Sequence, residues 1–94
     1  MLPLSLPKAD EYLKEVKGWK LSSDGRSITK TLRFKDFKSV ISFVNKVADL
    51  AEEEGHHPDL HVFYDELGIE ISTHAIGGLS ENDFILGAKI DRLI

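Results

Sequence analysis

The segment from Asp36 to Glu54 has the spacing of apolar residues that one long amphipathic helix requires. Asp36 belongs to the residue types that cap helix starts, and Gly55 is the type that most often ends them. Three glutamates fill the last turn, although the helix dipole disfavours each negative charge there by about 0.3–1 kcal/mol. Because such local conflicts are expected at functional sites, this helix end is a candidate site. The apolar positions are Phe37, Val40, Ile41, Val44, Val47, Ala48 and Ala51.

Two adjacent histidines, His56 and His57, follow the helix end. Pro58 cannot extend a helix, so it holds both imidazoles in a short turn. At about 100° per residue, Glu52 lies at the edge of the apolar stripe, whereas Glu53 points to the opposite, solvated side. Of the three acids, Glu52 is therefore the one that we expect to lean over a packed surface.

Alternating apolar and polar residues on both sides of this helix predict two β-hairpins. The first runs from Trp19 to Phe34 around turn residues 22–25, and we expect the single tryptophan to be a core or interface residue rather than a ligand platform. The second runs from Leu60 to His74 around turn residues 65–68. In this hairpin Tyr64 shares the side of Leu60, which favours packing beneath the candidate site at least as much as contact with a bound ligand.

Two further helices flank the hairpins. Pro7 suits the first turn of a short helix that ends by Gly18, and Ser80 and Asp83 have the spacing of a capping box that opens the last one. The last helix has two apolar sides, which one sheet can hardly bury together, so we expect a subunit contact to cover the second side. The first side carries Leu86, Ile90 and Leu93, and the second carries Phe84 and Ala88.

The order of these elements predicts an α+β fold, a four-stranded antiparallel sheet with three helices packed on one face (α-β-β-α-β-β-α). With 94 residues, the chain is expected to form a single domain over residues 1–94. The net charge of −4 argues against direct binding of nucleic acid, and the lack of cysteine excludes disulfides and thiol chemistry. No stretch approaches the roughly 20 apolar residues of a membrane span, so we expect a soluble, cytoplasmic protein.

The polar side chains around the helix end permit three kinds of chemistry. Imidazole and carboxylate groups can bind zinc or iron, but their spacing matches no familiar ligand motif, and we expect no metal. No serine stands in a strand-to-helix elbow, which argues against nucleophilic catalysis. General acid/base catalysis fits best, because two neighbouring imidazoles can donate and accept protons near neutral pH, provided that they converge on one small pocket. The candidates are Glu52, His56, His57, His61, His74 and Asp83.

A longer pattern contains these candidates, and its fixed positions are Glu52, His56, His57, Pro58, Tyr64, His74 and Asp83. This pattern resembles the signature of the pterin-4a-carbinolamine dehydratases. The similarity extends to Gly18-Trp19, Phe34-Lys35-Asp36-Phe37, Ser72-Thr73-His74 and Gly78-Leu79-Ser80, and it covers residues 16–91.

The resemblance implies a hydro-lyase that dehydrates 4a-hydroxytetrahydropterin to quinonoid dihydropterin and water. The substrate is the adduct left by pterin-dependent aromatic amino acid hydroxylases, so the reaction would recycle their tetrahydrobiopterin-type cofactor. A pterin is then the substrate, and no separate cofactor is implied. Members of the family typically form dimers whose sheets join edge to edge, and pairs of dimers meet through helices. The resemblance therefore implies a homodimer or homotetramer.

The resemblance also implies roles for individual residues. His56 and His57 match the paired acid/base groups, with no indication of which is acid and which is base. His74 matches a third imidazole, beside the departing hydroxyl, and Glu52 would orient or tune one of the histidines. Substrate contacts are implied for Tyr64, Asp83, His61 and Leu60.

Two of the implied substrate contacts, and the function itself, also permit another interpretation. Asp83 is equally well explained as a helix cap. Leu60 stands where many relatives have tryptophan, which affects the shape of the pocket wall. Some family members act as transcriptional coactivators and distant relatives assist protein assembly, so a non-enzymatic protein-interaction module with a regulatory protein partner is the alternative function.

Overall fold

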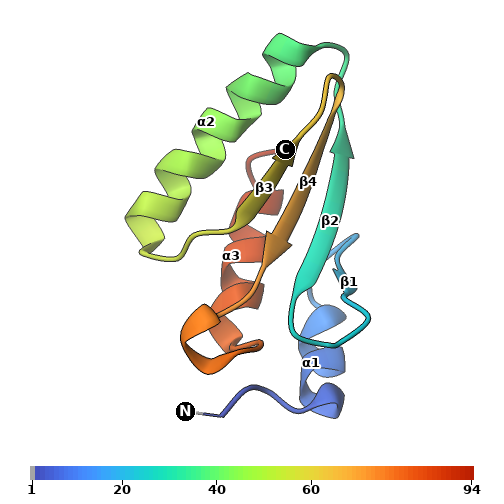
Figure 1. Cartoon of the computed structure of the whole chain (residues 1–94), viewed down its shortest axis with the longest axis vertical. Helices are drawn as coiled ribbons and strands as arrows, with labels where there is room; N and C mark the ends of the chain where they lie inside the picture. Colours follow the sequence, from blue (N-terminus) through green and yellow to red (C-terminus); the bar gives the residue numbers. More distant parts are fainter. Residues whose placement is uncertain (1) are drawn as a thin grey trace.

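The computed structural model describes residues 2–94, which form an open antiparallel sheet with helices on one face (Figure 1). The sheet has four strands in the order β1-β2-β4-β3. This architecture confirms the predicted α+β class and its element order. In chain order the elements are α1 (Leu6–Leu13), β1 (Lys20–Leu21), β2 (Ile28–Arg33), α2 (Phe37–Glu54), β3 (Asp59–Val62), β4 (Glu66–Ile71), a 3₁₀ turn η1 (His74–Ile76) and α3 (Glu81–Asp91).

Helix α2 begins and ends where the sequence predicts. The Asp36 carboxylate accepts a hydrogen bond of 2.8 Å from the Ser39 main-chain N–H, and hydrogen bonding to Ser39 lowers the pKa of Asp36 from its usual 3.8. At the other end Gly55 has a left-handed conformation, with φ 65°. The predicted apolar stripe is displaced around the helix, because α2 packs over the part of the sheet formed by β4 and the edge strand β3. Its buried residues are Val40, Phe43, Val47 and Ala51, while Phe37, Ile41 and Ala48 are exposed.

The second hairpin turns earlier than the sequence predicts. The main-chain N–H of Phe63 donates to the Glu66 carbonyl over 2.9 Å, which closes a turn at residues 63–65. Leu67, which was assigned to the turn, is instead fully buried in β4 opposite Val62. The prediction that Tyr64 packs beneath the candidate site is therefore wrong, since this side chain lies in the turn and is 71% exposed.

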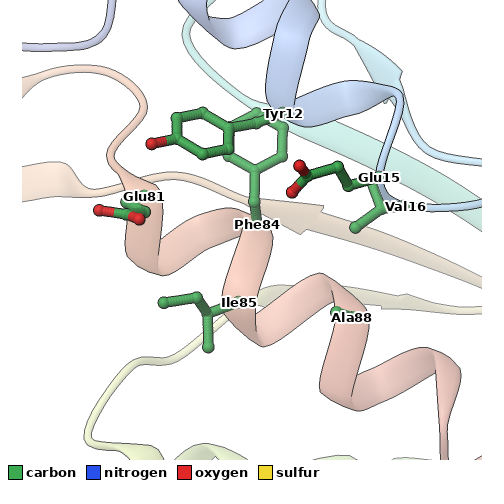
Figure 2. Close-up of a pocket in the computed structure, with 7 residues that line it drawn as sticks. All are labelled: Tyr12, Glu15, Val16, Glu81, Phe84, Ile85 and Ala88. Carbon is green, nitrogen blue, oxygen red and sulfur yellow. The ribbon is translucent and has the colours of Figure 1, made fainter.

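Helix α3 is covered on both of its apolar sides by the chain itself. Leu86 and Ile90 are buried, and the ring of Phe84 lies 5.4 Å from that of Tyr12 in α1 (Figure 2). The expected subunit contact is not needed to bury Phe84, because α1 fills that role. Helix α1 itself is shorter than predicted, and turns separate its end from Gly18.

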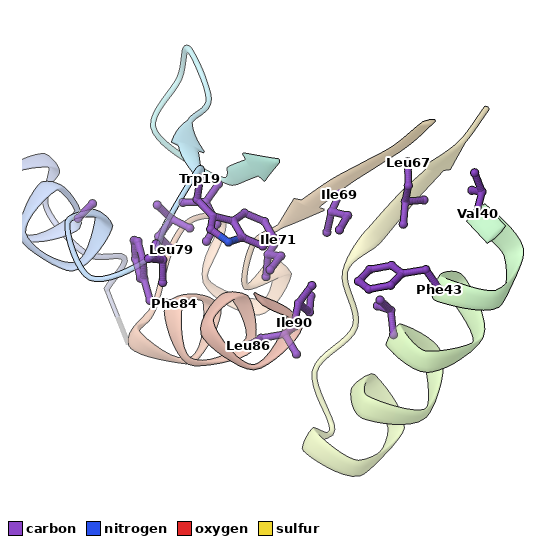
Figure 3. Close-up of a cluster of buried hydrophobic side chains, with 14 residues drawn as sticks. Trp19, Val40, Phe43, Leu67, Ile69, Ile71, Leu79, Phe84, Leu86 and Ile90 are labelled. Carbon is purple, nitrogen blue, oxygen red and sulfur yellow. The ribbon is translucent and has the colours of Figure 1, made fainter. Parts of the chain in front are cut away.

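The core lies between the sheet and the helices (Figure 3). Trp19 is buried, as predicted, and its indole N–H donates to the Asp91 carboxylate over 3.1 Å. The Lys30 ammonium group binds the same carboxylate at 2.7 Å. One acid at the end of α3 thus ties that helix to the first hairpin. Within residues 2–94, every helix is too short or too polar to cross a bilayer.

Candidate active site

Four segments that carry the candidate residues meet at one end of the molecule (Figure 1). They are the end of α2 with the loop after it, the start of β3, the η1 turn and the start of α3. Antiparallel packing explains this arrangement, because α2 and β4 both end where β3 and α3 begin. Residues far apart in the sequence are thereby brought together.

Each of the four histidines has a carboxylate oxygen close to its Nε2 atom. A carboxylate at hydrogen-bonding distance fixes the orientation of an imidazole. The pairs differ in burial, and only the pair that involves His56 is shielded from solvent. The pairs are His56–Asp83 at 2.5 Å, His57–Glu52 in direct contact, His74–Asp59 at 3.9 Å and His61–Glu70 at 3.9 Å.

Asp83 is the most buried polar residue of the candidate site, with no exposed surface. Its Oδ2 atom accepts hydrogen bonds from the Ser80 main-chain N–H at 2.7 Å and from the Thr73 hydroxyl at 3.0 Å. The predicted capping box at the start of α3 is therefore confirmed. Its other oxygen, Oδ1, faces His56, and this link across 27 residues was not anticipated.

Glu52 and His57 face each other on the surface, between the last turn of α2 and the loop that follows. Both side chains are exposed, so solvent screens their attraction. The contact agrees with the expectation that Glu52 orients a histidine, and its catalytic role stays a prediction. Of the other two glutamates, Glu54 is ion-paired with Lys89 at 2.8 Å, and Glu53 is exposed.

His74 lies in the η1 turn rather than at the end of a strand, and its side chain is 73% exposed. It borders a pocket of about 230 Å³ that is also lined by Arg26 and the backbone of Gly77 and Gly78. His56 borders a different pocket, of about 120 Å³. The expectation that the histidines share one pocket is thus not met within the single chain. The η1 turn directs the chain away from the sheet after β4, and the His74 side chain is therefore exposed to solvent.

The predicted substrate contacts lie in separate places. Leu60 faces the helices and packs against the core, whereas Tyr64 is in the turn at the opposite end of the sheet. His61 pairs with Gly68 across the strands and lies on the helix-free face, close to Glu70. Sequence reasoning missed Asp59, which is the carboxylate near His74. Asp59 directly follows Pro58, and this position next to the two histidines could have identified it as a candidate.

The position of His61 gives a test of which histidines belong to the site. Replacing His61 by alanine is expected to leave kcat and KM for a pterin carbinolamine close to the wild-type values, since its side chain is separated from His56 by the sheet. Steady-state assays of both proteins measure this. A large rise in KM would instead support the substrate contact that the resemblance implies.

Other features of residues 2–94 offer little competing chemistry. In this part of the chain, no group of three or more His, Cys, Asp and Glu side chains is arranged to hold a metal ion. A pocket of about 180 Å³ lies between α1 and α3 (Figure 2), but its polar lining consists of Tyr12 and two carboxylates, from Glu15 and Glu81. It contains no histidine, so the acid-paired imidazoles remain the candidate site.

The fold and this end of the molecule define a class of small α+β proteins with an open antiparallel sheet and imidazoles that face carboxylates where α2 ends and α3 begins. The family described as Pterin 4 alpha carbinolamine dehydratase matches residues 2–93. The chain therefore belongs to the pterin-4a-carbinolamine dehydratase family.

Individual relatives agree with this assignment. A protein of Stenotrophomonas maltophilia strain K279a, provisionally named pterin-4-alpha-carbinolamine dehydratase, is 49% identical over 88% of this chain and 72% of its own length. A protein of Xanthomonas campestris pv. campestris strain 8004, with the same provisional name, is 51% identical over 88% of this chain and 70% of its own.

Solved structures support the same fold. The crystal structure of a transcriptional coactivator/pterin dehydratase from Brucella melitensis superimposes with a TM-score of 0.90 at 27% identity, covering 97% of both chains. A pterin dehydratase-like protein described as a RuBisCO assembly factor of the alpha-carboxysome has a TM-score of 0.69 at 21% identity, covering 81% of this chain and 88% of its own. The second likeness concerns the fold alone.

Proposed function

We propose that this protein dehydrates 4a-hydroxytetrahydropterin to quinonoid dihydropterin and water, and thereby recycles the pterin cofactor of an aromatic amino acid hydroxylase in the cytoplasm. Family membership supports the substrate class. The observation that carries the proposal is the pair of adjacent imidazoles, His56 and His57, each with its own carboxylate at one end of the sheet.

The reaction needs one proton donor and one proton acceptor. The C4a–O bond breaks readily only when the leaving oxygen is protonated, and N5 must lose its proton as the C4a=N5 double bond forms. The proton given to oxygen leaves as water, and the proton from N5 restores the donor–acceptor pair, so no oxidant or cofactor is required. Imidazole side chains supply both the protonated donor and the neutral acceptor near neutral pH. Positioned proton transfer of this kind increases the reaction rate about 10²- to 10⁴-fold.

The arrangement of the histidines suggests how the substrate is held. His56 and His57 stand on one side of this end of the molecule, and His74 stands on the η1 turn. Since His56 and His74 border separate pockets, we propose that the planar pterin lies across both of them at this end, with His74 beside the departing hydroxyl. Gly77 lines the pocket of His74, and the space that a side chain would fill there is open, which leaves room for the ring.

A stopped-flow measurement of carbinolamine decay tests the proposal. The 4a-adduct is generated by a hydroxylase and its decay is followed with the protein, without it, and with free imidazole at four times the protein concentration. We expect the protein to accelerate decay far beyond the imidazole control, because its imidazoles are positioned. A decay rate equal to that of the imidazole control would refute the enzymatic function.

A second candidate function is binding of another protein. The favouring observation is a set of exposed apolar side chains on α2 and around the turn after β3, together with the coactivator description of the Brucella melitensis relative. The same surface could serve a homodimer or homotetramer. Sedimentation of the purified protein would establish its association state. The exposed residues are Phe37, Ile41, Val62, Phe63 and Tyr64.

A further inference from the structure

The two oxygens of Asp83 serve different parts of the molecule. Oδ2 accepts from the Ser80 main-chain N–H and the Thr73 hydroxyl, which completes the cap of α3. Oδ1 lies 2.5 Å from Nε2 of His56. A cap alone needs only one carboxylate oxygen, so the contact with His56 calls for a separate explanation.

We propose that Asp83 and Thr73 are positioning residues of the site, which hold His56 as the Nε2–H tautomer and leave Nδ1 as the nitrogen that exchanges the substrate proton. This inference rests on the dehydratase function proposed above. It assigns to Asp83 a role in orienting an imidazole, in place of the direct substrate contact that the resemblance implies.

The tautomer follows from the hydrogen-bonding capacity of the groups. An ionised carboxylate only accepts hydrogen bonds, so the ring nitrogen that faces Oδ1 of Asp83 must carry hydrogen. A neutral imidazole has one N–H group, and placing it on Nε2 leaves Nδ1 of His56 with a free lone pair. The other oxygen of Asp83, Oδ2, already accepts hydrogen bonds from two donors, so the carboxylate acts as an acceptor on both of its sides.

Thr73 fixes the carboxylate and connects it with His74. Its hydroxyl donates to Oδ2 of Asp83 and lies 2.7 Å from the Ser80 hydroxyl, which must then donate to it. Thr73 also caps η1, the turn that begins with His74, and its main-chain N–H donates to the Gly78 carbonyl over 2.9 Å. The same residue therefore holds the carboxylate behind His56 and the turn that carries His74.

Replacing Asp83 by asparagine reverses the hydrogen bond to His56. The amide oxygen must stay toward the Ser80 N–H, so the amide NH₂ faces His56 and requires an acceptor there. We expect the His56 ring to change from the Nε2–H to the Nδ1–H tautomer, and kcat to fall about 10- to 100-fold, as for other partners that orient an imidazole. KM should change less than kcat, because the substrate contacts are retained.

Ring ¹⁵N chemical shifts, recorded by NMR on the ligand-free protein, report the tautomer without any need for activity. Thr73→Val keeps the side-chain shape but removes the hydroxyl, so we expect a mixture of His56 tautomers and a smaller fall in kcat, with both restored in Thr73→Ser. Thr31→Val, on the exposed face of β2, is the matched control and should match the wild type in both measurements.

Three results would overturn the inference: His56 as the Nδ1–H tautomer in the wild type, an unchanged Nε2–H tautomer in folded Asp83→Asn, or equal effects of Thr73→Val and Thr31→Val on the ring shifts. If Asp83→Asn does not fold, the ring shifts and kcat of Thr73→Val and Thr73→Ser test the inference instead. A tautomer change in variants of a wild-type protein that lacks dehydratase activity would confirm the hydrogen-bond geometry and reject only the proposed function.

Discussion

Replacing His57 by alanine is expected to lower kcat for carbinolamine dehydration by about 10²–10⁴, the contribution of one positioned acid or base. The His57 side chain is exposed and faces the exposed Glu52 side chain, so its loss should leave the fold intact. Stopped-flow decay of the 4a-adduct measures the effect. Glu53→Ala is the control, because Glu53 is the exposed neighbour of Glu52 in the same last turn of α2.

The same variant separates the two candidate functions. A wild-type dehydration rate in His57→Ala would rule out His57 as an acid/base group. If dehydration is lost while binding to a protein partner or self-association persists, both functions reside in the chain on different surfaces. The exposed apolar residues Phe37 and Ile41 lie on α2 near its start, whereas His57 follows its end, so this outcome is structurally reasonable.

Replacing Leu67 by alanine is expected to lower the free energy of unfolding by about 2–5 kcal/mol, the range for a buried leucine whose removal leaves a cavity. Leu67 has no exposed surface and belongs to β4, which pairs with strands on both sides. Urea unfolding at 25 °C gives the difference from the wild type.

The control for this change is Leu2→Ala, because the Leu2 side chain is 88% exposed. It should unfold at nearly the wild-type urea concentration. If Leu67→Ala is no less stable than Leu2→Ala, residue 67 is in a turn, as the sequence pattern predicted, and the register of β4 with β2 and β3 is wrong.

The parts of the fold that the sequence predicts well depend on local chemistry. Asp36 and Gly55 fix the two ends of α2 because capping acts within a few residues. Ser80 and Asp83 start α3 for the same reason. Trp19 was expected in the core because a large apolar ring gains most from burial.

The errors arise where distant segments decide the outcome. The residues of α2 that are buried depend on where the sheet ends, and Phe43 was omitted from the predicted stripe for this reason. The turn at residues 63–65 depends on pairing of β4 with β2, which places Leu67 opposite Leu32. Both features depend on segments that are distant in the sequence, which a local pattern does not reveal.

The candidate site was predicted in part. The contact of Glu52 with His57 joins residues five positions apart across the turn at Gly55, so their closeness in the sequence could anticipate it. The link between His56 and Asp83 spans 27 residues and depends on packing of α3 beside the end of α2. A helix cap accounts for only one oxygen of Asp83, and the local pattern gives no signal for the contact of the other oxygen with His56.

The chain contains a single tryptophan, and that indole donates its N–H to Asp91 at the end of α3. Its fluorescence therefore reports the docking of α3 on the first hairpin, because separation of the two would expose the ring to water. Any ligand or mutation that loosens this helix would shift the emission to longer wavelength. The protein thus carries an intrinsic optical probe for the helix whose first turn contains Asp83.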